Sequence, residues 1–163
     1  MRKIVLIGTV ALLALAFTAV GGATPPASDT FGFTYSDTLS CSGLGFGFDD
    51  NFAGSVSIRE TTFFDSKGNA IRIQDHVAAV ETNVNSVTGK SFVMRGDVTI
   101  VQDLVSGTWS WNGAANLANE TGRGIVIHDT GKIVFDANGD VVFEGGPHQV
   151  IDIGPEVFCA ALA

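Results

Sequence analysis

Residues 121–148 read TGRGIVIHDTGKIVFDANGDVVFEGGPH, and the fold prediction starts from this stretch. Apolar residues alternate with others in three short runs, Ile125–His128, Ile133–Phe135 and Val141–Phe143, as is typical of β-strands. Both alternate positions are apolar in places, which predicts strands that are central in a sheet or covered on both faces. Asn138-Gly139, between the last two runs, can adopt the positive φ angles that a tight turn needs. The stretch therefore predicts a β-hairpin.

Similar alternation continues toward the N-terminus. Five more strand candidates lie at residues 31–35, 53–64, 70–83, 91–104 and 108–119. With the hairpin they make seven or eight strands in up-and-down order, with almost no helical periodicity. The predicted fold is all-β, a single antiparallel β-barrel, because closure removes the edges that invite aggregation. Gly96 interrupts its strand, and the bulge that this predicts favours a curved sheet. A β-sandwich is the alternative.

The N-terminus has the pattern of a secretory signal peptide. Arg2-Lys3 precede an apolar run, Ile4–Val20, and the small residues Gly21–Ala23 follow. We expect cleavage after this tripeptide and export from a bacterial cell, leaving a flexible lead-in at residues 24–30 and one β-barrel domain at residues 31–163. An uncleaved membrane anchor is the alternative, because 17 apolar residues approach the length that spans a bilayer.

The charge of the chain restricts its partners. The sequence holds 9 basic and 17 acidic residues, a formal net charge of −8, and loss of Arg2 and Lys3 with the signal peptide would make it −10. An acidic surface repels phosphate backbones and anionic lipids. We therefore expect no nucleic-acid partner and no stable membrane insertion after cleavage of the signal peptide.

The chain has two cysteines, Cys41 and Cys159. In an exported protein an even pair is most simply a disulfide, and this one would close a loop of about 118 residues. The alternative is a reactive thiol, although neither cysteine has the context of a nucleophile. Residues 155–162, PEVFCAAL, predict a short C-terminal helix or tail, since proline suits the first turn of a helix. A disulfide would pin this segment to the start of the domain.

Residues 121–148, together with the C-terminal VFCAALA, resemble an uncharacterised family of small exported bacterial proteins, mostly actinobacterial. The resemblance covers residues 121–163, and it implies secretion and a β-rich domain with no assigned chemistry. A secreted barrel of long antiparallel strands is also similar in architecture to allene oxide cyclases and plant dirigent proteins. No catalytic motif of those families maps onto this chain, so no functional residue is inferred from them.

Two aspartates are the candidate catalytic residues. In steps of two residues, Ile71 and Ile73 lead to Asp75, and Ile125 and Ile127 lead to Asp129. Without a bulge, both carboxylates face the same interior as these isoleucines. Burial would raise the pKa of either carboxyl and suit it to acid–base work. In the alternative the strands end or bulge there and the carboxylates are solvated.

Three further residues are candidate ligand-binding residues. Trp109 and Trp111 lie two apart and share a face, where they can stack on a ligand or fill the core. His148 follows Gly146-Pro147 at a strand end, where the loops of a barrel mouth gather. The histidines lack the close spacing of metal ligands, and no phosphate-binding loop occurs, so we expect neither a metal nor a cofactor.

These observations leave three hypotheses of function. The first is a secreted barrel that binds a small hydrophobic molecule, as closed barrels can. The second is a cofactor-free cyclase or isomerase that uses an interior carboxylate. The third is an extracellular structural or interaction protein, and the sequence is silent on its oligomeric state.

Overall fold

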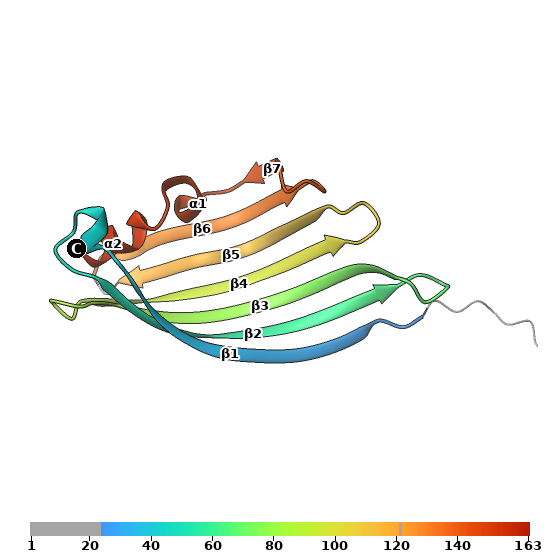
Figure 1. The fold of residues 1–163 in the computed structure, drawn as a ribbon, viewed down its shortest axis with the longest axis horizontal. Coiled ribbons are helices and arrows are strands. Elements are labelled where there is room, and N and C mark those ends of the chain that lie inside the picture. Colours follow the sequence, from blue (N-terminus) through green and yellow to red (C-terminus); the bar gives the residue numbers. More distant parts are fainter. Residues whose placement is uncertain (1–23, 121) are drawn as a thin grey trace, which may run out of the picture.

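The computed structural model describes residues 24–120 and 122–163, so the predicted signal peptide, residues 1–23, lies outside the described residues. Seven antiparallel strands form one sheet in chain order, each paired with the next (Figure 1). Their bounds are β1 (Ala27–Leu39), β2 (Asp50–Phe64), β3 (Ala70–Asn85), β4 (Ser91–Asp103), β5 (Trp109–Glu120), β6 (Gly124–Phe135) and β7 (Val141–Gly145). The all-β class is confirmed. No helix in the described part of the chain is long and apolar enough to cross a membrane.

The sheet is open, so the predicted closed barrel is not confirmed. Its strand order ends at β1 on one side and β7 on the other, and neither pairs with a second strand among the described residues. Closure would need a last strand that runs along β1, but β7 has 5 residues against 13 in β1. Gly145 and Gly146 end β7, and the chain then turns away from the edge. The described strands form one sheet, which also excludes the predicted alternative, a sandwich of two sheets.

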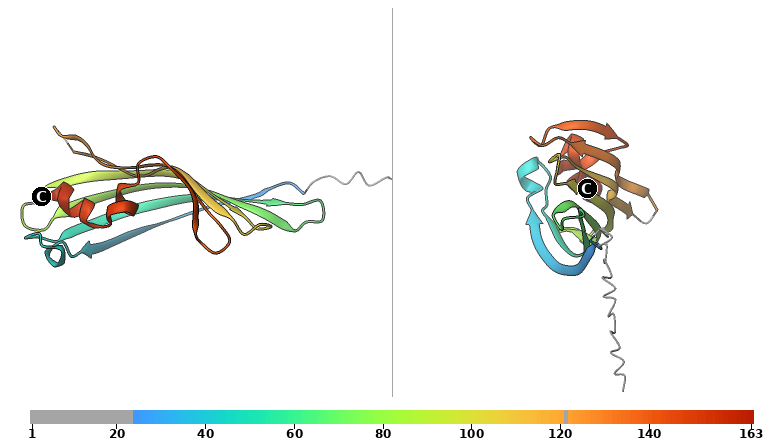
Figure 2. Two further views of the ribbon diagram at one scale, coloured as in Figure 1. Left: turned by 90° about the horizontal axis from the view of Figure 1, so that it is seen from above. Right: turned by 90° about the vertical axis from the view of Figure 1, so that its right-hand side faces the viewer.

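The sheet is strongly curved (Figure 2). We call the face that carries Phe52, Val56 and Ile58 of β2 the inner face. On β2 the inner residues Phe52, Val56 and Ile58 are half-buried, whereas Ser55 and Ser57 on the outer face are exposed. This alternation follows from the two-residue period of a strand. A bulge at Gly96, as the sequence predicts, shifts the pairing of β4 with β5 and adds to the curvature.

Two short helices cover the inner face near one end of the sheet, α1 (Gln149–Ile153) and α2 (Glu156–Leu162). The C-terminal segment, predicted as a short helix or a tail, is the helix α2. The buried core lies between α2 and the sheet, and it consists of Phe92, Ala118, Ile127, Ala161 and Leu162. Hydrophobic burial in the described chain is therefore concentrated where the helices pack.

The predicted disulfide is confirmed. Cys41, between β1 and the 3-10 turn η1 (Ser42–Leu44), bonds Cys159 of α2, with the two Cα atoms 5.6 Å apart. Both cysteines are fully buried, and they are the only cysteines in the sequence. The disulfide joins the start of the domain to the helix that covers the inner face.

Two local predictions are wrong. The flexible lead-in at residues 24–30 is mostly strand, because residues 27–30 pair with residues 59–62 of β2. The last strand is not covered on both faces: Val141, Val142 and Phe143 are more than half exposed, because β7 is an edge strand. Apolar residues at both alternate positions do not by themselves show where a strand lies in a sheet.

Candidate functional site

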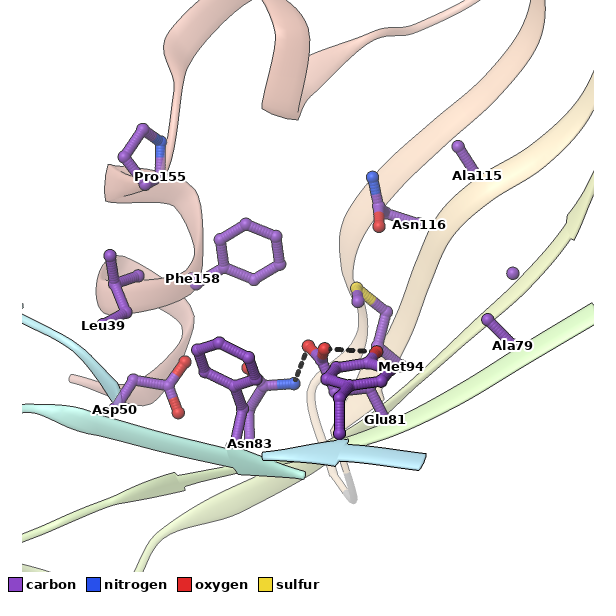
Figure 3. A pocket seen from close by; sticks show the side chains of 13 residues that line it. Leu39, Asp50, Ala79, Glu81, Asn83, Met94, Ala115, Asn116, Pro155 and Phe158 are labelled. Atoms are coloured by element: carbon purple, nitrogen blue, oxygen red, sulfur yellow. Dashed lines mark hydrogen bonds between the residues drawn. The ribbon is translucent and has the colours of Figure 1, made fainter. Parts of the chain in front are cut away.

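A cavity of about 390 Å³ lies between the inner face of the sheet and α2 (Figure 3). Strands β1 to β5 form its floor, and Pro155 and Phe158 form the wall on the side of α2. Most of the lining is apolar, including Leu39, Phe52, Ala79, Met94, Ala115 and Phe158. Clefts and cavities with mostly apolar walls and a few polar groups are the usual form of small-molecule sites.

The register of the strands builds the floor of this cavity. Tyr35, Gly54, Glu81 and Met94 lie directly opposite one another on four neighbouring strands. Because Gly54 has no side chain, the Tyr35 ring lies across it; an added Cβ at Gly54 would come within 2.7 Å of that ring. The tyrosine thereby reaches over β2 to Glu81 on β3.

Glu81 is the centre of a hydrogen-bond network on the cavity floor (Figure 3). The Tyr35 hydroxyl donates to Glu81 Oε2 at 2.7 Å, and Asn83 Nδ2 donates to Oε1 at 2.9 Å. Burial and the neighbouring Glu81 carboxylate together raise the pKa of Tyr35 to about 12. The phenol therefore stays protonated near neutral pH and acts as a donor, which fixes the position of the carboxylate.

Asp50 is the second acidic group of the cavity. Its side chain is almost fully buried, and its Oδ1 accepts a hydrogen bond from the Val84 backbone N–H at 3.1 Å. Its Oδ2 is buried and has no hydrogen-bond partner in the described protein. Burial raises the pKa of Asp50 to about 6; the Val84 N–H opposes this rise and the charge of Glu81 adds to it. Asp50 therefore has an acceptor atom free for another group.

Asp129, a candidate catalytic residue, is buried on the inner face, which is one of the two arrangements that the sequence left open. Both of its oxygens already have partners: Oδ2 accepts from Asn116 Nδ2 at 2.9 Å, and Oδ1 accepts from the Val150 N–H in α1 at 3.1 Å. A bulge between Ile125 and Ile127 leaves Ile125 exposed. The regular alternation of faces therefore holds from Ile127 to Asp129 but does not include Ile125. The geometry of Asp129 is that of a group that anchors α1 to β6.

Asp75, the other candidate, lies on the inner face of β3, opposite Glu60 of β2 and Ile100 of β4. Its side chain is half-buried, and burial raises its pKa. Its Oδ1 is buried and has no hydrogen-bond partner among the described residues. Two strands, β4 and β5, separate Asp75 from the strand of Asp129, so the structure does not bring the two carboxylates together.

The aromatic candidates lie away from the cavity lining. Trp109 and Trp111 share the inner face, as predicted. The Trp109 ring stacks on Phe135 with centroids 3.8 Å apart, whereas Trp111 meets the His148 ring edge-on at 5.2 Å. His148 is buried, and neither of its ring nitrogens has a hydrogen-bond partner in the described ranges. Trp111 and His148 therefore pack together at the start of α1. Trp109 and Phe135 form a separate pair where β5 begins and β6 ends.

Sequence reasoning missed the residues that line the cavity, namely Tyr35, Asp50 and Glu81. The sequence held a signal for Glu81: it lies six residues after Asp75 on the same strand, so the two-residue alternation places both on the same face. Asp50 gave no signal, since it precedes the predicted start of its strand at residue 53. In the described ranges no group of three or more His, Cys, Asp and Glu residues is placed to hold a metal ion.

The resemblance of residues 121–163 to a family of exported bacterial proteins stays a prediction. No family model, curated protein or solved structure matches this chain.

Proposed function

We propose that this chain is a secreted binding protein whose ligand is a small, largely apolar molecule held in the cavity between the inner face and α2. The observation that carries the proposal is the cavity itself: about 390 Å³, with apolar walls and convergent polar groups on its floor. Cavities of roughly 300 to 1,000 Å³ with this distribution of polarity are typical ligand sites.

The walls and the floor serve different purposes in this proposal. Leu39, Phe52, Met94 and Phe158 offer apolar surface whose burial by a ligand stabilises the complex by about 25 cal/mol per Å². The fixed carboxylate of Glu81 orients the ligand, because Tyr35 and Asn83 hold it in place before binding. Polar groups positioned in advance reduce the entropy that binding costs.

The disulfide supports export. Disulfides persist in oxidising compartments and are rare in the cytosol. The Cys41–Cys159 bond also holds α2, and with it the Phe158 wall, against the sheet. A ligand site that depends on an oxidised cysteine pair suits a protein that works outside the cell.

The test is binding of the neutral dye N-phenyl-1-naphthylamine, which fluoresces in apolar surroundings. Ala79→Phe would place a ring in the cavity, whereas Ala78→Phe, one residue earlier on β3, would place the same ring on the exposed outer face. We expect the saturable rise in dye fluorescence to be largely lost in Ala79→Phe and to be kept in Ala78→Phe. Equal binding by both variants would contradict the proposal, because the dye would then bind outside the cavity.

A second candidate function is a cofactor-free cyclase or isomerase, which the architectural similarity to allene oxide cyclases suggested. The observation that favours it is the buried, unpartnered Oδ1 of Asp75, whose raised pKa suits a proton carrier. Molecules that co-purify with the protein would be identified by mass spectrometry and incubated with it and with Asp75→Asn. Conversion to an isomer of equal mass by the wild type alone would support an enzyme, and unchanged recovery would favour a binding protein.

A further inference from the structure

The charges around the cavity are unbalanced. Asp50 on β2 and Glu81 on β3 are both at least nine-tenths buried, and both line the cavity. Among the residues that the structure describes, no lysine, arginine or histidine lines the cavity. Burying an unpaired carboxylate is costly, and proteins usually offset the cost with a counter-charge or with hydrogen bonds.

The two carboxylates have acceptor capacity left. Glu81 receives one hydrogen bond on each oxygen, although an ionised carboxylate can accept about four in total. Asp50 receives one hydrogen bond on Oδ1 and none on Oδ2 from the described protein. The unused acceptor sites therefore belong to buried groups on the cavity lining.

These groups discriminate between classes of ligand. A carboxylate or phosphate on the ligand would be repelled by Asp50 and Glu81. An alcohol could donate a hydrogen bond but would leave the negative charge unbalanced. A protonated amine supplies both donors and charge, and the rings of Tyr35, Phe52 and Phe158 provide faces that attract cations and apolar groups alike.

We propose that the ligand is an organic amine, whose ammonium group binds Glu81 and is also attracted by the charge of Asp50, while its apolar body lies against Phe52, Met94 and Phe158. This proposal rests on the proposed function, since it names the chemical class of the molecule held in the same cavity. It assigns the recognition of charge to the floor of the cavity and the recognition of shape to its walls.

Protons compete with the amine in this arrangement. The pKa of Asp50 is about 6, so the group gains a proton as the pH falls through that value and attracts an ammonium less. Around Asp50, β3 contributes Glu81 and β1 contributes Tyr35, while α2 contributes no ionisable side chain to the lining. Tyr35 stays neutral in this range. Amine binding should therefore strengthen as the pH rises from 5 to 7.

The experiment compares three indoles that differ in one terminal group. Tryptamine carries an amine, tryptophol a hydroxyl, and indole-3-propionate a carboxylate. Binding of each would be measured by calorimetry at pH 7.5 to the oxidised wild type, to Glu81→Gln and to Glu60→Gln. Glu60 is the matched control, because it lies on the inner face of β2 but outside the cavity lining.

For the wild type we expect tryptamine to bind about tenfold or more tightly than tryptophol, and indole-3-propionate to bind weakest. Glu81→Gln should weaken tryptamine by about tenfold and leave tryptophol nearly unchanged, while Glu60→Gln changes neither. Asp50→Asn is a second, independent variant in case Glu81→Gln does not fold, as judged by circular dichroism. It should abolish the rise in tryptamine affinity between pH 5 and 7.

The outcomes separate the two proposals. Tryptophol binding as tightly as tryptamine, or indole-3-propionate binding tightest, would overturn the amine and leave the cavity as a ligand site. If none of the three indoles binds while the naphthylamine dye still binds in the cavity, the amine is likewise wrong and the ligand site stands. If the dye does not distinguish Ala79→Phe from Ala78→Phe, the ligand site itself is wrong, and the amine is wrong with it.

Discussion

The covered and uncovered regions of the inner face follow the same sequence pattern but differ in burial. In the covered region, Phe92 of β4 is 3% exposed and packs with Ile127 and Leu162. In the uncovered region, Phe33 of β1 also points to the inner face but is 54% exposed. The difference is the presence of α2 over the first region. The two-residue period of a strand therefore sets which face of the sheet a side chain lies on. Whether that side chain is buried depends on a segment far away in the sequence.

The cavity lies where the two regions meet. Its floor runs from Tyr35 on β1 to Asn116 on β5, and its wall is the edge of α2. The disulfide holds that wall, so the stability of the covered region and the presence of the cavity are coupled. The expected effects below test this difference between the two regions.

Loss of the disulfide should have the largest effect. Closing a 118-residue separation stabilises the fold by about 5 kcal/mol in the chain-entropy model. The double variant Cys41→Ser/Cys159→Ser should lose about that much unfolding free energy in urea titrations, and the dye should no longer bind in the cavity. Adding reductant to this variant, as a control, should change nothing further. A loss below about 1 kcal/mol would show that packing alone holds α2 in place.

Two matched phenylalanine substitutions compare the regions directly. Phe92→Ala removes a buried ring and should cost about 3 to 5 kcal/mol. Phe33→Ala removes an exposed ring from the same face and should cost less than about 1 kcal/mol. Both values come from urea unfolding of the oxidised protein. Equal costs would mean that something covers β1 in solution and that the uncovered region is not free.

The pH dependence of stability should report on Asp50. Its folded pKa of about 6 is raised above the ordinary value of 3.8, so the folded state binds the extra proton between these values. The stability that this proton contributes is fully present below pH 3.8 and is lost as the pH rises through 6, a difference of roughly 3 kcal/mol.

Asp50→Asn isolates this effect, because other carboxyls titrate in both proteins. We expect the variant to gain stability over the wild type as the pH rises from 4 to 7, measured by urea unfolding at each pH. The control is Asp29→Asn, on an exposed carboxylate of β1, which should follow the wild-type profile. A constant difference between Asp50→Asn and the wild type over this pH range would contradict the raised pKa.

The smallest expected effect concerns the stacked pair Trp109 and Phe135, which lies away from α2. Stacked aromatic pairs contribute about 0.5 to 1.5 kcal/mol beyond the area they bury. A double-mutant cycle with Trp109→Leu and Phe135→Leu should give a coupling free energy of about 1 kcal/mol. A coupling near zero would show that the pair adds only apolar area.

Much of the fold could be predicted from the pattern of apolar residues and glycines in the sequence. Alternation located β3 and β4 to within two residues, and it placed Trp109 and Trp111 on one face. The Gly96 bulge was predictable because glycine in a strand marks a close approach, and an added Cβ there would lie 2.7 Å from the Ala115 carbonyl oxygen. These features depend on neighbours within one or two strands.

The candidate site was predictable only in part. The two-residue alternation placed Asp129 on the inner face as one of two alternatives, yet it gave no sign that Asn116 and Val150 would occupy both of its oxygens. It also gave no reason to prefer Glu81 to Asp75 on the same strand. The difference between these groups lies in their hydrogen-bond partners, which come from other strands and from the helices.

The sequence by itself determined the all-β class, the face on which each side chain of a regular strand lies, a C-terminal segment that is either a helix or a tail, and the pairing of Cys41 with Cys159. These follow from the two-residue period of a strand, from local helix signals and from there being two cysteines. Only the tertiary structure decided that the sheet stays open, that α2 covers one region of it, and that Asp50 and Glu81 meet around one cavity. The physical reason is that burial on the inner face depends on which segment packs against it, and those contacts join residues far apart in the chain.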